Sequence, residues 1–207
     1  MLIVIEGQDA TGKDTQARLL AEYLRGRGEK VTAYAESGTG SEDPFVAEIA
    51  RLNYRTEQDI DHRTRVLLFL VNRYEQWRKL AEPALKRGEI VILTRNWLST
   101  LIYEGYAGGV SKSLIFRLHK EVMPEPYFKP DKMVILTLSD EERQKRLVAQ
   151  AKEQGRVGEV LKTQPSEFQK KVNMAYLKVA DEMGIETLDT KGTIAEVQER
   201  LRQKLGW

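Results

Sequence analysis

The stretch GQDATGKDTQ, residues 7–16, decides how the rest of this chain is interpreted. It meets the pattern G-x-x-x-x-G-K-[ST] at Gly7, Gly12 and Lys13. It departs from the pattern at the last position, where Asp14 stands in place of a serine or threonine. The pattern describes a loop whose backbone N–H groups surround phosphate, and it carries meaning only between a strand and a helix.

Short apolar runs alternate with longer segments of helical period along the whole chain. This alternation predicts βαβ units around a parallel sheet. The expected strands are 2–6, 30–36, 89–94, 132–138 and 185–189. The expected helices are 13–27, 44–53, 59–87 with an interruption at Pro83, 97–107, 111–122, 140–152, 165–183 and 193–205. The sequence therefore predicts an α/β fold with a five-stranded parallel sheet flanked by helices, and with ligands at the carboxyl ends of the strands.

Composition limits the classes of protein to consider. The 207 residues suffice for one domain, 1–207, and 33 basic against 31 acidic side chains give a formal charge of only +2. This charge favours no nucleic-acid partner, and the absence of cysteine excludes disulfides and thiolate metal sites. The first apolar run ends at Glu6, too early for a membrane span, so we expect a cytoplasmic protein. His62 and His119 have no partner at catalytic spacing, and we expect structural or surface roles for both.

The loop itself is expected to bind phosphate. Its glycines let the backbone turn N–H groups inward, the following helix adds its dipole, and Lys13 can reach the β- and γ-phosphates. Asp14 in the first helical turn would stabilise the helix by about 0.3–1 kcal/mol, but beside a triphosphate its charge would repel unless a cation lay between. Because carboxylate oxygens suit Mg²⁺, we favour Asp14 as a direct or water-mediated metal ligand over a purely helix-stabilising residue. The residues expected to contact ATP here are Gly7, Gln8, Asp9, Ala10, Thr11, Gly12, Lys13, Asp14 and Thr15.

Several segments, in the same order, resemble the motifs of the thymidylate kinase family of P-loop nucleoside-monophosphate kinases. They are IVIEGQDATGKDTQ (3–16), AESGTG (35–40), LLFLVNRYEQW (67–77), VILTRNWLSTLIYEG (91–105) and SDEERQKRLVAQAKEQGRVGE (139–159). The resemblance covers nearly the whole chain. It implies the three-layer P-loop NTPase fold with a small lid at about 140–160, a homodimer, and Mg²⁺-dependent phosphoryl transfer from ATP to dTMP that gives dTDP and ADP.

The resemblance also implies roles in an acceptor site. Asp9 would accept a hydrogen bond from the 3′-hydroxyl of the sugar. Phe69 would stack on thymine, and Arg73, four residues later on the same helix, would donate to its carbonyl edge. Arg95 would hold the acceptor phosphate and stabilise charge on the transferred group, while Tyr103 would crowd the sugar 2′ position. Weaker candidates for substrate contact in the same motifs are Glu36, Gln76 and Ser99.

A lid of this kind folds over ATP, excludes water and brings arginine to the phosphates. Ala10 gives the phosphate loop no cation of its own, so we expect the lid to supply one. Arg156 is the first candidate, and Arg146 is expected to contact the base or phosphates of ATP. Lys13, Arg95 and Arg156 would then provide most of the electrostatic catalysis.

The chain departs from the family at two positions whose side chains, in the usual arrangement, approach the same Mg²⁺. Thr94 replaces the acid that precedes the strand-end arginine, and Asp14 replaces the loop hydroxyl. We hypothesise that the two changes compensate, with Asp14 supplying the metal-directed charge and Thr94 a hydroxyl behind it. Three alternatives remain open from sequence. They are a kinase for another deoxynucleoside monophosphate, a catalytically impaired nucleotide-binding protein of the same fold, and a nucleic-acid-binding module, which the near-neutral charge disfavours.

Overall fold

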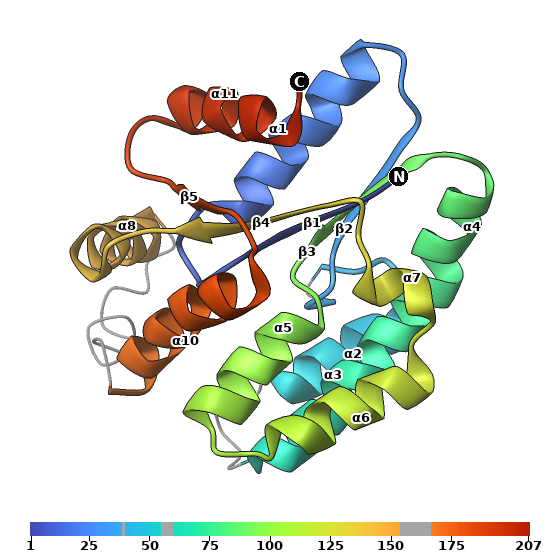
Figure 1. The fold of residues 1–207 in the computed structure, drawn as a ribbon, viewed down its shortest axis with the longest axis vertical. Helices are drawn as coiled ribbons and strands as arrows, with labels where there is room; N and C mark the ends of the chain where they lie inside the picture. The colour runs from blue at the N-terminus through green and yellow to red at the C-terminus, as the bar shows by residue number, and fades with distance from the viewer. Residues whose placement is uncertain (39, 55–59, 154–166) are drawn as a thin grey trace.

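A parallel five-stranded sheet forms the centre of the computed structural model, which describes residues 1–38, 40–54, 60–153 and 167–207 (Figure 1). The strands are β1 (Leu2–Gly7), β2 (Val31–Ala35), β3 (Ile90–Thr94), β4 (Lys132–Thr137) and β5 (Thr187–Asp189). Their order is β2-β3-β1-β4-β5, so the chain places strands on both sides of β1. Ile5 of β1 pairs with Thr94 of β3, and the loops after these two strands therefore begin next to each other. All five predicted strands are confirmed.

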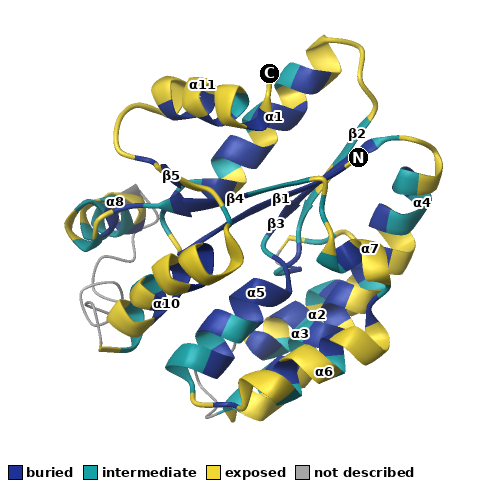
Figure 2. Cartoon of the chain, viewed as in Figure 1, coloured by how far each residue is buried: buried dark blue, intermediate teal, exposed yellow. Residues whose placement is uncertain are grey.

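Helices cover both faces of the sheet. One core joins alternate residues of β1, such as Ile3 and Ile5, to α1 (Lys13–Gly26) and α11 (Ile194–Leu205). The other core joins Leu2 and Val4 to helices on the opposite face, including α10 (Glu167–Met183). Figure 2 shows β1 and β3 buried between these layers, as expected for a parallel sheet covered on both faces. The three-layer prediction is confirmed.

Most of the remaining helices lie with α10 on its face of the sheet (Figure 1), whereas α8 lies beside the carboxyl ends of β4 and β5. They are α2 (Pro44–Asn53), α3 (His62–Gln76), α4 (Glu82–Lys86), α5 (Trp97–Thr100), α6 (Lys112–Val122), α7 (Glu125–Phe128) and α8 (Asp140–Glu153). The short α7 lies in a segment for which the sequence predicted no helix. Within the described residues, no helix is long and apolar enough to cross a membrane.

Two helices contain wider, π-helical turns. The expected interruption at Pro83 was wrong, because α3 continues through η1 (Trp77–Ala81) into α4. Glu82 donates its backbone N–H to the carbonyl oxygen of Trp77, five residues earlier. Pro83 then lies in the first turn of α4, where the N–H that proline lacks is not needed for a helical hydrogen bond. The second π-helix, η2 (Leu101–Ala107), extends α5 and carries Tyr103 and Glu104. π-Helical turns of this kind are frequent at functional sites.

Candidate active site

Two cavities meet at the loop after β1. The first, of about 340 Å³, is lined by six of the eight residues predicted for the acceptor site: Asp9, Phe69, Arg73, Arg95, Ser99 and Tyr103. The second, of about 430 Å³, is lined by residues Ala10 to Gln16 of the loop and the first turn of α1, together with residues of α8 and α11. Lys13 and Asp14 line both cavities. A group held at these two residues can therefore pass between a ligand in one cavity and a ligand in the other.

The loop has the backbone geometry that its glycines were expected to provide. Gly7 has a φ of 146°, and a Cβ there would lie 2.6 Å from the carbonyl oxygen of Leu136. Gly12 precedes α1 in the left-handed region, with a φ of 85°. A side chain at either position would strain the loop. Thr11 closes the turn by donating its hydroxyl to the Gln8 carbonyl at 2.8 Å.

Lys13 lies between two carboxylates at the junction of the cavities. Its Nζ is 3.4 Å from Asp9 Oδ1 and 3.6 Å from Asp14 Oδ2, and the residue is buried. Burial and the nearby charge of Arg95 lower the pKa of Lys13, while the two aspartates oppose that change. The lysine is thus already engaged by carboxylates before any phosphate arrives.

Arg95 has its backbone in the left-handed region, with a φ of 71°, a conformation that costs about 1–3 kcal/mol in a residue with a side chain. This places the guanidinium in the first cavity, where Nη2 donates to Asp9 and Nη1 donates to Ser99 Oγ at 2.9 Å. The Tyr103 ring centroid is 5.3 Å from the guanidinium carbon. Asp9 faces the cavity but is partly desolvated, which would raise its pKa; Arg95 and Lys13 outweigh this and lower the pKa of Asp9 to about 2.

Glu6, which was not among the residues predicted from the sequence, supports Arg95 through a network of buried hydrogen bonds. It is fully buried at the end of β1. Its carboxylate accepts hydrogen bonds from the Asn96 N–H at 2.7 Å, the Ser99 hydroxyl at 2.8 Å and the Tyr176 hydroxyl at 3.0 Å. Ser99 thus connects Glu6 to Arg95, in addition to lining the cavity. The signal was present in the sequence, since Glu6 ends an otherwise apolar strand.

Arg73 is held rigidly at the far end of the first cavity and is only 2% exposed. Its Nε donates to Glu36 Oε2 at 3.0 Å, and its Nη1 donates to Thr100 Oγ1 at 2.5 Å. The guanidinium carbon lies 5.3 Å from the Phe69 ring centroid. Nη2 has no hydrogen-bond partner among the described residues, so it is available to a ligand.

Glu36 and Gln76 lie behind Arg73, outside the lining of the first cavity. Burial raises the pKa of Glu36 to about 7, although Arg73 and the Tyr127 hydroxyl, 2.8 Å away, stabilise its charge. Gln76 donates to the Glu36 backbone carbonyl at 3.2 Å. The structure therefore places both residues where they support Arg73, and direct substrate contact by either stays a prediction.

Both histidines have partners that are distant in sequence, which their spacing along the chain does not reveal. His119 is buried and lies 2.8 Å from the Ile115 carbonyl through Nδ1 and 3.3 Å from Arg73 Nη1 through Nε2. Since the carbonyl only accepts and arginine only donates, His119 is neutral with its proton on Nδ1. Burial and Arg73 lower the pKa of His119 to about 3.

His62 contacts the carboxylate of Glu104, which lines the first cavity and is 4% exposed. Burial raises the pKa of Glu104, while His62 opposes that rise. The His62 ring is also stacked on Phe168 of α10, with centroids 6.0 Å apart. Sequence reasoning missed Glu104, although it directly follows Tyr103.

Asp14 and Thr94, the two positions of departure, are joined by a hydrogen bond. Thr94 Oγ1 donates to Asp14 Oδ1 at 2.7 Å. Thr94 is buried at the end of β3, whereas the Asp14 side chain is 65% exposed at the junction of the cavities. Within the described part of the chain, no group of three or more His, Cys, Asp or Glu residues could hold a metal alone. The exposed Asp14 carboxylate, held by the Thr94 hydroxyl, fits Mg²⁺, which commonly uses one or two carboxylates together with substrate phosphates and water.

In the second cavity, Arg146 of α8 donates to the backbone carbonyl and to Oγ1 of Thr190, the latter at 3.4 Å. A Cβ on Gly12 would lie 3.8 Å from Arg146 Nη1, so this arginine lies over the phosphate loop. Thr15 lines the same cavity, while Gln8 points elsewhere and donates to Gln169 of α10 at 2.8 Å. Arg156, the predicted lid cation, lies outside the described residues.

Comparison with known proteins gives one consistent result. The family model described as thymidylate kinase matches residues 5–201. A thymidylate kinase from Caldicellulosiruptor saccharolyticus is 32% identical over 97% of this chain and 93% of its own length. A probable thymidylate kinase from Thermococcus onnurineus is 35% identical over 87% of this chain and 84% of its own length. The crystal structure of thymidylate kinase from Ehrlichia chaffeensis superposes with a TM-score of 0.72 at 26% identity, covering 99% of this chain and 98% of that one.

Proposed function

The chain belongs to the thymidylate kinase family, and we propose how its own residues carry out that family's reaction. The reaction is transfer of the γ-phosphoryl group of ATP to dTMP, which gives dTDP and ADP. The observation that carries the proposal is the position of Lys13 and Asp14, which line both cavities at their junction. The two substrates then meet end to end at this junction.

ATP occupies the second cavity in this proposal. The loop N–H groups and Lys13 hold its β- and γ-phosphates, and Arg146 lies above them beside Thr190. Asp14 would hold Mg²⁺ together with the phosphates, with Thr94 fixing the carboxylate. The bound ion supplies positive charge that neutralises the β- and γ-phosphate oxygens.

dTMP occupies the first cavity. Its phosphate lies against Arg95, its 3′-hydroxyl donates to Asp9, and its thymine stacks on Phe69 with its edge toward Arg73 Nη2. Tyr103, packed beside Arg95, lies along the sugar and disfavours a 2′-hydroxyl.

The acceptor phosphate oxygen attacks the γ-phosphorus in line, and the bond from that phosphorus to the β–γ bridging oxygen breaks. No general base is needed, because a phosphate oxygen is already ionised at neutral pH, and catalysis comes from positioning and charge stabilisation. Lys13 and Arg95 stabilise the transferring group. We propose Arg156, in the lid at about 140–160, as the third cation, with lid closure excluding water from a single catalytic domain.

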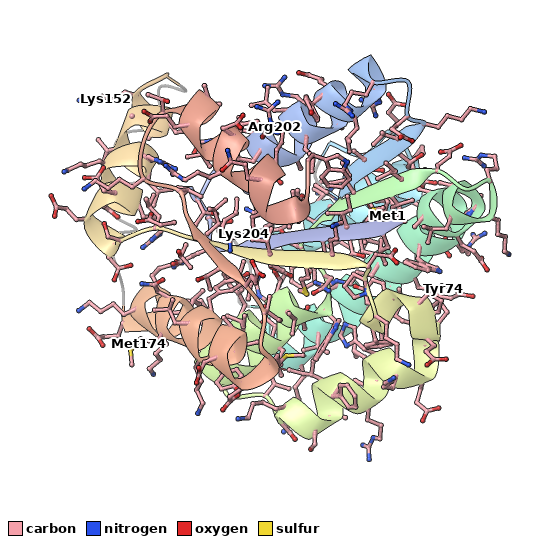
Figure 3. The ribbon with its side chains drawn as sticks, turned by 45° about the horizontal axis from the view of Figure 1, so that its top comes forward. Met1, Tyr74, Lys152, Met174, Arg202 and Lys204 are labelled. Carbon is pink, nitrogen blue, oxygen red and sulfur yellow. The ribbon has the colours of Figure 1, made fainter. Side chains whose placement is uncertain are left out.

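We further propose that the chain acts as a cytoplasmic homodimer. Three exposed apolar side chains of α3, Leu67, Val71 and Tyr74, are spaced by four and three residues and so share one face of the helix. Tyr74 projects away from the body of the protein in Figure 3. Pairing this face with the same face of a second copy would bury all three side chains in a two-fold interface.

The proposal is tested by measuring ADP formation from ATP and Mg²⁺ with a panel of nucleoside monophosphates. We expect rapid turnover with dTMP and weak turnover with UMP, because Tyr103 crowds the position of a 2′-hydroxyl. No turnover with any acceptor, while ATP still binds, would contradict the proposed roles.

A further inference from the structure

The residue after the phosphate-loop lysine differs chemically from the usual one. Phosphate loops of this pattern carry a Ser or Thr there, whose hydroxyl binds Mg²⁺. Here the position is Asp14, whose side chain is 65% exposed and lines both cavities. In the proposed arrangement, a carboxylate at this point lies close to the γ-phosphate of ATP.

The charges around Lys13 determine how the Asp14 carboxylate affects a bound nucleotide. Lys13 Nζ lies 3.4 Å from Asp9 and 3.6 Å from Asp14, so its single charge is shared between two acids. Arg95 pairs with Asp9 and leaves Asp14 as the acid facing the phosphates. Metal-free ATP therefore meets a like charge at its γ-phosphate, whereas a divalent cation between the two groups converts repulsion into attraction.

Thr94 fixes the direction of the carboxylate. Thr94 is held in the sheet, paired with Ile5 of β1 and Ala35 of β2, and its hydroxyl donates to Asp14 Oδ1 at 2.7 Å. Oδ2 is then the oxygen presented beside Lys13, at the junction of the cavities. Thr94 thus acts as a positioning residue for Asp14.

We propose that Asp14, positioned by Thr94, makes this phosphate loop select the divalent-metal complex of a nucleoside triphosphate over the metal-free nucleotide. The inference rests on the proposed use of ATP. It adds that the Asp14 carboxylate disfavours metal-free ATP when the nucleotide binds. A purely helix-stabilising Asp14 would leave the metal preference unchanged.

The test is calorimetric titration with ATP, without dTMP, in excess Mg²⁺ and in EDTA. The quantity compared is the ratio of the Kd in EDTA to the Kd in Mg²⁺. We expect the wild-type ratio to exceed that of Asp14→Ser and Asp14→Asn at least tenfold, mainly because both variants bind metal-free ATP more tightly. Thr94→Val should lie between. Glu22→Gln is the matched control, because Glu22 is a half-exposed acid on the same helix, paired with Arg18 at 2.7 Å, and its ratio should equal the wild-type value.

The outcomes separate the inference from the proposed function. An unchanged ratio in both Asp14 variants would overturn the inference and leave the kinase assignment standing. If wild type bound ATP in neither condition, the proposed donor site itself would fail, and the inference with it. Asp14→Asn retains an oxygen that accepts from Thr94, so a folding defect confined to Asp14→Ser would still leave a decisive comparison.

Discussion

Replacement of Arg73 by methionine tests the buried ion pair at the far end of the first cavity. Arg73 and Glu36 are 2% and 0% exposed in their side chains, and the variant leaves the Glu36 carboxylate buried without its cation. Breaking such a pair from one side costs about 3–5 kcal/mol. At roughly 2–4 °C per kcal/mol for a chain of this length, the melting temperature should fall by about 6–20 °C.

An exposed pair on the same helical segment provides the control. Arg78 donates two hydrogen bonds to Glu75, at 2.9 and 2.7 Å, with its side chain 49% exposed. Exposed pairs contribute about 0–1 kcal/mol, so Arg78→Met should lower the melting temperature by less than about 4 °C. Combining Arg73→Met with Glu36→Gln should recover part of the loss, because the second change removes the unpaired charge.

The pH dependence gives the sign of the effect. Burial already raises the pKa of Glu36 from 4.5 to about 7, so the folded state holds the Glu36 proton more tightly than the unfolded state does. The stability that this difference contributes is fully present below pH 4.5 and is lost as the pH rises through 7. Without Arg73 the carboxyl holds its proton more strongly still. Urea unfolding of Arg73→Met should therefore show a smaller loss at pH 5 than at pH 8. An equal loss at both pH values, or a loss no larger than that of Arg78→Met, would refute this reasoning.

Four further changes have defined outcomes. Arg95→Lys should lower kcat/KM for dTMP about 10²–10³-fold in steady-state assays with an unchanged fold by circular dichroism, because lysine cannot bond Asp9 and Ser99 together as the guanidinium does. His119 has a pKa of about 3 in the folded protein against 6.5 when unfolded, so the stability contributed by the neutral imidazole is lost as the pH falls below 6.5. In urea unfolding, the free energy of unfolding of His119→Gln should therefore fall less between pH 6.5 and 4 than that of wild type. Asp14→Thr combined with Thr94→Asp should retain more kinase activity than either single change, and simple addition of the two losses would disprove an exchange of roles. Val71→Asp should shift the mass measured by light scattering from a dimer to a monomer, and a monomeric wild type would rule out the proposed interface.

Much of the architecture could be predicted because it depends on local patterns. A buried strand, a glycine-rich turn and a helix at 2–27 left one reasonable geometry for the phosphate loop, and the five apolar runs became the five strands. The π-helical turns could not be predicted in this way. Their wider spacing does not alter the apolar period enough to be recognised.

The position of a residue in the candidate site was predictable where a motif fixes both residue and spacing, as at Lys13 and Arg95, which line the first cavity. Partners distant in sequence were not predictable from spacing. Glu6 meets Tyr176, which is 170 residues away, and His119 meets Arg73 only because α6 packs against α3. Glu36 shows the same limit, since its motif suggested the substrate while its burial places it behind Arg73.

The most direct test of the account is the binding of one compound that fills both cavities, adenosine and thymidine joined 5′ to 5′ through five phosphates. In the proposed arrangement, a triphosphate and an acceptor phosphate lie end to end at Lys13 and Asp14. We predict that one molecule binds per chain and that it competes with both ATP and dTMP. Competition with only one of the two substrates, or two molecules bound per chain, would contradict the claim that the cavities form a single transfer site.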